Sequence, residues 1–237
     1  ASPAFAGETV RLEVTTNDYD YTTNQVQYSY VPAPIITFFT PATGGVYGAT
    51  RVAVHGTGFQ FTTTLACSFD NVRSKATFVN DTNIICIAPP LHDPMKKNVD
   101  IYILPNGVDR VPCPSGFIFT YVELPSVKAM YPTSGARSIP TAVHVDGQNY
   151  VNVSTLTCRF SLHSSTTEED VYSMGLYINR TSVQCIVPDF LSFTDMTSAK
   201  NTSTTAASAA DQVSIYVSNN GQDFSASSTT FFYTNND

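Results

Sequence analysis

Residues 51–59 read Arg-Val-Ala-Val-His-Gly-Thr-Gly-Phe, and this stretch decides the fold because a related one returns at residues 142–150 as Ala-Val-His-Val-Asp-Gly-Gln-Asn-Tyr. Valines alternate with small or polar residues in both copies, and each copy ends in a turn before an aromatic residue. Alternation with a period of two, bounded by Gly and Pro, predicts a strand with one buried face. No stretch of a dozen residues in the sequence has convincing helical periodicity. The pattern therefore predicts an all-β chain of antiparallel sandwiches.

A second pattern lies downstream of these strands and occurs three times along the chain. Each copy has an alternating strand, a polar turn and a closing aromatic strand. The three turns start at Asn17, Asn106 and Asn220. The aromatic strands close at tyrosines 30, 121 and 233, which are 91 and 112 residues apart. That spacing is the size of a domain and is too long for a solenoid repeat.

The repeats predict the domain boundaries. Residues 32–122 and 123–237 each form a full domain, and the second carries insertions at residues 163–170 and 190–210. Residues 1–31 hold only the last strands of a preceding, incomplete domain. Two or three strands are marginal alone, so they complete that domain or pair with another copy of the chain. The short linkers contain proline, so neighbouring domains are expected nearly end to end with limited swing.

Four of the five cysteines fall into two similar local patterns. Cys67 and Cys158 each precede an aromatic residue by two positions, and Cys86 and Cys185 each precede a proline by three. The repeat therefore pairs Cys67 with Cys86 and Cys158 with Cys185, and buried free thiols are the alternative. Each disulfide would contribute about 3 kcal/mol in the chain-entropy model. A zinc site is disfavoured, because Cys-x-x-Cys is missing from the sequence and the histidines are scattered.

The fifth cysteine, Cys113, has no counterpart in the other repeats. It is expected to be unpaired: it either bonds to another chain or remains a buried or capped thiol.

Glycosylation signals agree with an oxidising compartment. Asn-x-Ser/Thr sequons occur at Asn80, Asn152, Asn179 and Asn201. Chance alone would give some of them, because 54 of the 237 residues are Ser or Thr. Together with paired cysteines they favour a secreted or cell-surface glycoprotein carrying N-glycans, and the Ser/Thr content also allows O-glycans. The 190–210 insertion is expected to be exposed, and a partner-binding loop is its sharper interpretation.

The ordered set of these features resembles the IPT/TIG domain, an immunoglobulin-like family of plexins, scatter-factor receptors and Rel-type transcription factors. The set runs from Pro-x-Ile through aromatic-x-Pro, Gly-Gly, the Val-rich strand, Cys-x-Phe and Cys-x-x-Pro to Asn-Gly and a closing Phe-x-Tyr. The resemblance implies tandem early-type immunoglobulin sandwiches with one disulfide each. The later copy departs from it with Gly135-Ala136 in place of Gly-Gly and Asn149 in place of Gly58.

Composition narrows the classes of function. The net charge is -7, with charged residues at 13% against a typical 25% or so. An acidic chain of this kind argues against nucleic-acid binding. Apolar runs stay well short of the roughly 18 residues of a membrane span. The sequence shows no recognisable signal peptide, so it is interpreted as mature or as a fragment.

Candidate chemistry is sparse. The sequence lacks the usual hydrolase, metalloprotease, phosphate-loop and dinucleotide motifs, so no catalytic residue, cofactor or metal site is predicted. The acidic run at residues 168–170 is interpreted as solvated charge, because calcium needs oxygens from several segments. His55 and His144 are expected on the exposed face of their strands. The closing aromatics are expected in core and interdomain packing, with an exposed strip for glycan stacking as the alternative.

The sequence thus favours a non-catalytic structural or adhesive segment of an extracellular array or fibre. In this role it acts as a rigid spacer that contacts protein partners or copies of itself. Alternatives are the ligand-binding ectodomain of a cell-surface receptor and a carbohydrate-binding accessory module of a secreted enzyme.

Overall fold

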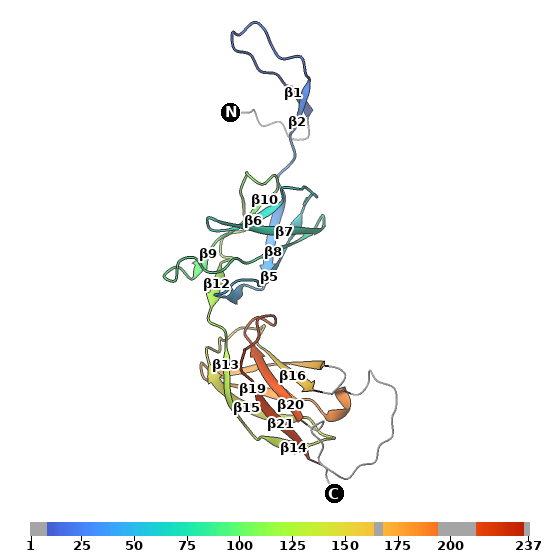
Figure 1. Cartoon of the computed structure of the whole chain (residues 1–237), viewed down its shortest axis with the longest axis vertical. Helices are drawn as coiled ribbons and strands as arrows, with labels where there is room; N and C mark the ends of the chain where they lie inside the picture. The colour runs from blue at the N-terminus through green and yellow to red at the C-terminus, as the bar shows by residue number, and fades with distance from the viewer. Residues whose placement is uncertain (1–8, 164–167, 194–211, 235–237) are drawn as a thin grey trace.

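The structure is a computed structural model that describes residues 9–163, 168–193 and 212–234. A β-hairpin, a first sandwich (β3–β12) and a second sandwich (β13–β21) follow one another along the long axis of the molecule (Figure 1). Each sandwich has its own hydrophobic core. None of the described residues forms a helix long and apolar enough to cross a membrane.

The hairpin pairs two short strands, β1 (Thr9–Leu12) and β2 (Val26–Ser29), in antiparallel register. Their side chains are exposed on both faces apart from the half-buried Val10. Apolar side chains such as Leu12, Val26 and Tyr28 remain about half exposed, at 52%, 46% and 46%. An isolated two-stranded hairpin is marginal in water, so these side chains gain little from burial within the described chain.

The first sandwich has a bent sheet of seven strands and a smaller sheet of three. The order is β11-β10-β6-β7-β8-β5-β3 in the large sheet and β4-β12-β9 in the small one. The strands are β3 (Ile35–Thr40), β4 (Thr43–Gly45), β5 (Arg51–Thr57), β6 (Ala66–Phe69), β7 (Val72–Asn80), β8 (Asn83–Ile87), β9 (Asn98–Val99), β10 (Ile101–Leu104), β11 (Val111–Pro112) and β12 (Phe119–Val122).

The seven-stranded sheet folds into both layers of the sandwich because β7 serves two neighbours. Its first half pairs with β6, from Val72 to Lys75, and its second half pairs with β8, from Ala76 onward. Alternate residues Val52 and Val54 of β5 are fully buried, as the sequence pattern predicts. The layers are joined across the core by the Cys67–Cys86 disulfide, whose Cα atoms lie 5.9 Å apart.

The second sandwich repeats this plan with two separate sheets, β13-β15-β19-β18 and β14-β21-β20-β16-β17. The strands are β13 (Ser126–Tyr131), β14 (Ser134–Ala136), β15 (Thr141–Gln148), β16 (Thr157–His163), β17 (Glu168–Met174), β18 (Leu176–Asn179), β19 (Ser182–Val187), β20 (Gln212–Ser218) and β21 (Thr229–Thr234). A short 3-10 helix, η1 (Phe190–Phe193), follows β19.

Gly175 divides the strand that corresponds to β7 into β17 and β18. A Cβ at this position would lie 2.9 Å from Leu156 Cγ, so the chain can pass this close to the core only as glycine. The second disulfide, Cys158–Cys185, joins β16 to β19 with a Cα separation of 6.1 Å.

The expectation of purely antiparallel sheets is wrong at one place in each sandwich. β4 runs parallel to β12, and β14 runs parallel to β21. The first strand of each sandwich gives way to a short strand that joins the opposite layer. Because β4 and β14 cross to the sheet of the last strand without reversing direction, they meet it in parallel. In both copies the crossing contains a cis X-Pro bond, at Pro41 and Pro132.

The turn at Asn149 has the same backbone conformation as its glycine counterpart. Asn149 has φ 64° and Gly58 has φ 79°. Asn tolerates the left-handed region better than most residues, so the departure from glycine leaves this turn intact.

Candidate interdomain interface

The turn between β20 and β21 is held in shape by one asparagine. The side-chain Oδ1 of Asn220 accepts hydrogen bonds from the backbone N–H of Gln222 at 3.0 Å and of Asp223 at 2.8 Å. Its Nδ2 donates to Asp223 Oδ2 at 2.7 Å. Gly221 supplies the positive φ of 73° that the turn requires. The carboxylate of Asp223 is thereby fixed at the tip of the turn.

This carboxylate reaches across to the first sandwich. Asp223 Oδ2 accepts hydrogen bonds from Thr50 Oγ1 at 2.6 Å and from the backbone N–H of Gly45 at 3.0 Å. Thr50 is fully buried, and Gly45 is buried as well. A charged acceptor in such a place is stabilised because several donors surround it.

Two further side chains of the turn bind backbone groups of the first sandwich. Asn220 Nδ2 donates to Thr43 O at 3.0 Å. The amide of Gln222 forms a pair of bonds with Arg51: Oε1 accepts from the backbone N–H at 3.1 Å, and Nε2 donates to the carbonyl at 2.9 Å. We call the Asn220–Asp223 turn together with Thr43, Gly45, Thr50 and Arg51 the clasp.

Glycines open the space into which the turn fits. A Cβ on Gly44 would lie 2.5 Å from Phe119 Cζ and 2.6 Å from Thr50 Oγ1. A Cβ on Gly45 would meet only the side chain of Leu124 at 3.1 Å and Asp223 Oδ2 at 3.6 Å. The first glycine is therefore required by the core of its own sandwich, whereas the second lets the linker and the turn approach.

The linker adds contacts beside the clasp. Asn149 Nδ2 donates to Leu124 O at 3.1 Å, and Lys97 pairs with Glu123 at 3.7 Å. The ion pair is about half exposed and contributes little. The carbonyl contact of Asn149, by contrast, ties the linker to the turn after β15. Two sandwiches joined by a three-residue linker are thus also bonded through side chains.

The turn chemistry of the clasp is repeated in the other two segments. Asn106 Oδ1 accepts from the N–H groups of Val108 and Asp109 at 3.0 and 2.9 Å, and its Nδ2 donates to Asp109 Oδ2 at 2.8 Å. Asn17 makes the same three bonds with Tyr19 and Asp20, at 3.1, 2.9 and 2.8 Å. The aspartate three residues after each asparagine is the sequence signal for these turns, but it does not distinguish the turn that contacts another sandwich from the two that do not.

The five cysteines lie as follows. Cys67, Cys86, Cys158 and Cys185 form the two buried disulfides described above, and Cys113 is a half-buried free thiol beside the first core. Burial raises the pKa of the Cys113 thiol to about 12, and the charge of Asp100 adds to the shift. A thiol with this pKa stays protonated at neutral pH, which lowers its reactivity.

Three of the four sequon asparagines, at positions 80, 152 and 179, are exposed on the surface. Asn201 lies outside the described residues, as do most of the 190–210 insertion and part of the 163–170 insertion. Asn80 and Asn179 occupy equivalent hairpin turns. The Oδ1 of each accepts from the N–H and hydroxyl of its sequon threonine, Thr82 or Thr181.

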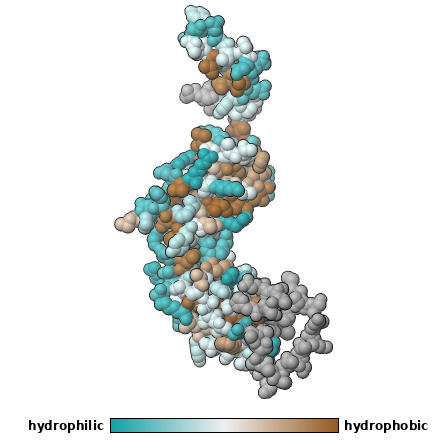
Figure 2. All heavy atoms as spheres, in the orientation of Figure 1, coloured by the Kyte–Doolittle hydropathy of each residue, from teal (hydrophilic) through white to brown (hydrophobic). Residues whose placement is uncertain are grey.

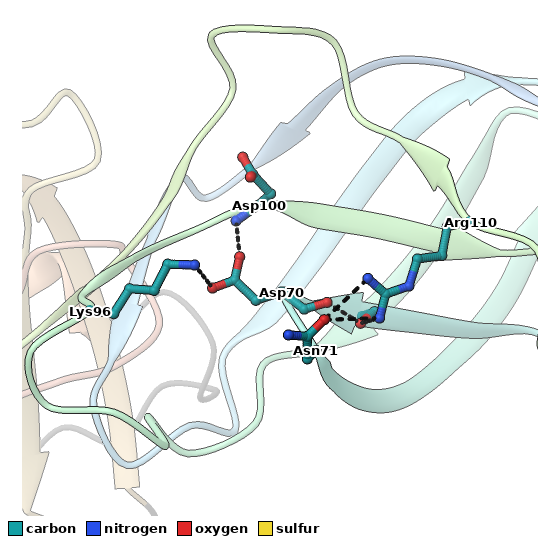
Figure 3. A network of polar contacts seen from close by, with 6 residues as sticks. Asp70, Asn71, Lys96, Asp100 and Arg110 are labelled. Atoms are coloured by element: carbon teal, nitrogen blue, oxygen red, sulfur yellow. Dashed lines mark hydrogen bonds and ion pairs between the residues drawn. The ribbon is translucent and has the colours of Figure 1, made fainter.

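A polar network ties the far end of β6 to the loop before β9 (Figure 3). Asp70 lies between β6 and β7 with φ 50°, accepts a bond from the Asp100 N–H at 3.0 Å and pairs with Lys96. Arg110 donates to Asn71 Oδ1 at 3.4 Å. Lys96 is 60% exposed, so this network orders loops at the surface of one sandwich.

The remaining candidate residues, the histidines and the acidic side chains, do not form a cluster that could bind a metal ion in the described part of the chain. His55 lies on the outer face of β5, where it is half buried because it stacks on Phe38 with ring centroids 4.3 Å apart, and His144 is exposed. Among the described residues, no group of three His, Cys, Asp or Glu side chains could hold a metal ion.

The closing aromatics divide between core and surface. Phe119, Tyr121, Phe231 and Tyr233 are buried in the two cores, whereas Phe232 is half exposed. The hydroxyls of Tyr121 and Tyr233 donate to the carbonyls of Pro89 and Pro188, at 2.7 and 2.8 Å. Four of the eight closing aromatics therefore pack within the sandwiches as expected, whereas Tyr28, Phe117 and Phe232 are 46%, 39% and 50% exposed.

Comparison with known proteins agrees with this architecture. Residues 34–119 match the family model of the IPT/TIG domain, so the first sandwich is an IPT/TIG domain. A search of curated proteins finds no match.

One solved structure supports the same fold. A structure of the full extracellular region of plexin A4, domains 1 to 10, is similar with a TM-score of 0.51 and 17% identity, over 68% of this chain and 13% of that chain. A second plexin A4 structure, with domains 1 to 8, has a TM-score of 0.49 and 13% identity over 93% of this chain and 20% of that one. This chain spans at most a fifth of the length of these two structures.

Proposed function

We propose that this chain is a non-catalytic structural segment of an extracellular glycoprotein, in which consecutive IPT/TIG sandwiches act as a rigid spacer and a protein contact surface. The clasp is the observation that carries the proposal. The clasp forms directional hydrogen bonds between the two sandwiches, whereas a flexible linker alone would let them rotate. Thr50 and Asn220, two of its residues, are buried at 0% and 6% exposure.

Two features support the proposed compartment. Both sandwiches carry a fully buried disulfide, and disulfides of this kind persist in oxidising environments. Three exposed sequons are accessible for N-glycans. Export from the cell is therefore part of the proposal. The proposal also interprets the strands within residues 9–29 as part of a further sandwich of the same array.

The contact role is supported by an exposed apolar stripe. Tyr172, Met174 and Leu176 on β17 and β18 are 55%, 75% and 62% exposed. β17 and β18 are each the outer strand of their sheet, where unpaired backbone groups are also available to a partner. Figure 2 shows further hydrophobic surface on the first sandwich and at the base of the hairpin.

The rigid-spacer role can be tested directly in solution. Residual dipolar couplings of the ¹⁵N-labelled chain should fit one common alignment tensor for the two sandwiches, and small-angle scattering should give an extended particle. If each sandwich needs its own tensor, the junction is flexible and the spacer role is wrong.

A further inference from the structure

The second sandwich carries its own version of the surface that receives the turn in the clasp. Three positions recur 91 residues later in the sequence, with Ser134, Ala136 and Thr141 in place of Thr43, Gly45 and Thr50. They lie on β14 and at the start of β15, at the end of the molecule that Figure 1 places farthest from the hairpin. We call these three residues the second acceptor.

The backbone of the second acceptor has the same orientation as that of the first. Val46 N donates to Val122 O at 3.1 Å, and Arg137 N donates to Thr234 O at 3.3 Å. Alternate N–H groups of a paired strand point to opposite sides. The N–H groups one residue earlier, on Gly45 and Ala136, therefore point away from the sheet. In the clasp, that outward N–H binds the carboxylate of Asp223.

The side chains around this N–H also correspond. Thr50 Oγ1 and Thr141 Oγ1 both stand over a glycine, because a Cβ on Gly44 or on Gly135 would overlap them. The change from Gly45 to Ala136 leaves room for a carboxylate. A Cβ at Gly45 would lie 3.6 Å from Asp223 Oδ2, which is an ordinary van der Waals distance.

A matching turn lies at the opposite end of the same chain. The tip of the hairpin, Asn17 to Asp20, has the internal hydrogen bonds of the Asn220–Asp223 turn to within 0.1 Å. Asp20 is exposed, and the tip projects away from the two sandwiches (Figure 1). Tyr19 replaces Gln222, so the paired bonds to the Arg51 backbone have no equivalent there.

We propose that the second acceptor binds the Asn17–Asp20 turn of a second copy of this chain. The Asp20 carboxylate accepts from the Ala136 N–H and the Thr141 hydroxyl, and the Asn17 amide donates to the Ser134 carbonyl. This proposal rests on the proposed structural role and extends it from one chain to an assembly. The two surfaces are different and lie far apart on the described structure, so the contact is heterologous and repeats from copy to copy unless the rotation between copies closes a ring.

The contact between chains is expected to be weak. Within one chain, the short linker holds the turn of the clasp near its acceptor at an effective concentration on the order of millimolar. Between chains that tether is missing and the Gln222 bonds are lost. Association should therefore appear only as the protein concentration approaches that range.

Complementation between two variants tests the proposal by sedimentation velocity. Asp20→Ala removes the carboxylate at an exposed tip, and Ala136→Asp places a like charge where the carboxylate would bind. Each variant alone should self-associate with a dissociation constant at least about tenfold higher than that of the wild type, because a charge-assisted hydrogen bond is lost or opposed. A mixture of the two retains one working pair of surfaces. It should form dimers that do not grow further.

Controls separate this contact from general charge and folding effects. Ser138→Asp adds the same charge at an exposed neighbouring position and should associate like wild type. Thr141→Val, an isosteric change, should weaken association if Ala136→Asp proves unfolded. A wild-type chain that stays monomeric at millimolar concentration overturns the proposal, as does a mixture that behaves like its separate components. Neither result affects the common alignment tensor that tests the spacer role.

Discussion

The carboxylate of Asp223 lies 2.6 Å from the hydroxyl of Thr50, although 173 residues separate the two in the chain. Thr50 belongs to the edge of the first sandwich and Asp223 to a turn of the second. A proline-containing linker limits how far two domains can swing, but it does not fix their rotation. This hydrogen bond and its neighbours in the clasp define that rotation in the structure, so under the proposed spacer role the relative orientation of the two sandwiches depends on a few polar side chains.

Removing the carboxylate of the clasp should loosen the junction. In Asp223→Ala, the buried Thr50 hydroxyl loses its acceptor and the Gly45 N–H keeps only its 3.3 Å bond to Thr50 Oγ1. A buried donor without a partner costs about 1–3 kcal/mol. We expect hydrogen exchange to accelerate at Gly45 and along β4, and the common alignment tensor of the two sandwiches to separate into two.

The matched control for this variant is Asp109→Ala. Asp109 makes the same bond within its own turn, with Asn106 Nδ2 at 2.8 Å, but it is exposed. Its removal should cost only the internal bond and leave the two sandwiches aligned. Equal effects of the two substitutions on interdomain alignment would show that the clasp does not hold the junction.

Two adjacent glycines should respond differently to alanine. Gly44→Ala places a Cβ within 2.5 Å of Phe119 Cζ in the core of the first sandwich, and overpacking of this kind costs about 1–3 kcal/mol. Gly45→Ala meets only the movable end of Leu124 at 3.1 Å, and the second sandwich already has alanine at this place. The urea midpoint of the first sandwich, followed by hydrogen exchange, should fall for Gly44→Ala and change little for Gly45→Ala. The reverse order would contradict this assignment of the two glycines.

Local patterns in the sequence were enough to predict the all-β architecture. The alternation at residues 51–57 depends only on which face of a strand is buried, and β5 buries Val52 and Val54 as it predicts. The pairing of cysteines followed from a repeat within the chain. The alternation is a short-range signal, and the repeat compares one part of the chain with another. A single sequence is therefore enough to detect both.

Features that depend on the three-dimensional path were beyond the sequence. Nothing in residues 72–80 marks the point at which β7 leaves one layer for the other, because either half reads as a strand. The parallel pairing of β4 depends on where the chain crosses after Pro41. The clasp joins Asp223 to residues more than 170 positions away, and no local spacing encodes that meeting.

Peptide mapping under non-reducing conditions should find the Cys67–Cys86 and Cys158–Cys185 pairs and an unmodified Cys113. Replacing either pair by alanines should cost about 2–5 kcal/mol in the affected sandwich. Cys113 should react slowly with a neutral-pH thiol reagent until urea unfolds the first sandwich, because its protonated form is stabilised by burial. A disulfide-linked dimer that disappears on reduction would instead assign Cys113 to an intermolecular bond.

The buried Tyr121 of the first sandwich should make the protein lose stability at alkaline pH. Burial raises the pKa of Tyr121 from 10.0 to about 12, with a smaller contribution from Asp70, and its hydroxyl donates to Pro89 O at 2.7 Å. A pKa that is higher in the folded state favours the protonated form there. The resulting stabilisation is complete below pH 10 and is lost as the pH rises towards 12. The free energy of unfolding should therefore fall over this window.

Tyr121→Phe isolates this effect. It removes the titrating group together with its hydrogen bond, so the variant should be less stable than its parent at neutral pH, and the difference should shrink as the pH approaches 12. The comparison is best made in a Cys113→Ala background. That chain has no free thiol to attack the disulfides under alkaline conditions. The raised pKa of Cys113 also no longer contributes to the change of the free energy of unfolding with pH. A stability difference that stays constant across the window would show that the Tyr121 hydroxyl does not titrate differently in the folded and unfolded chains.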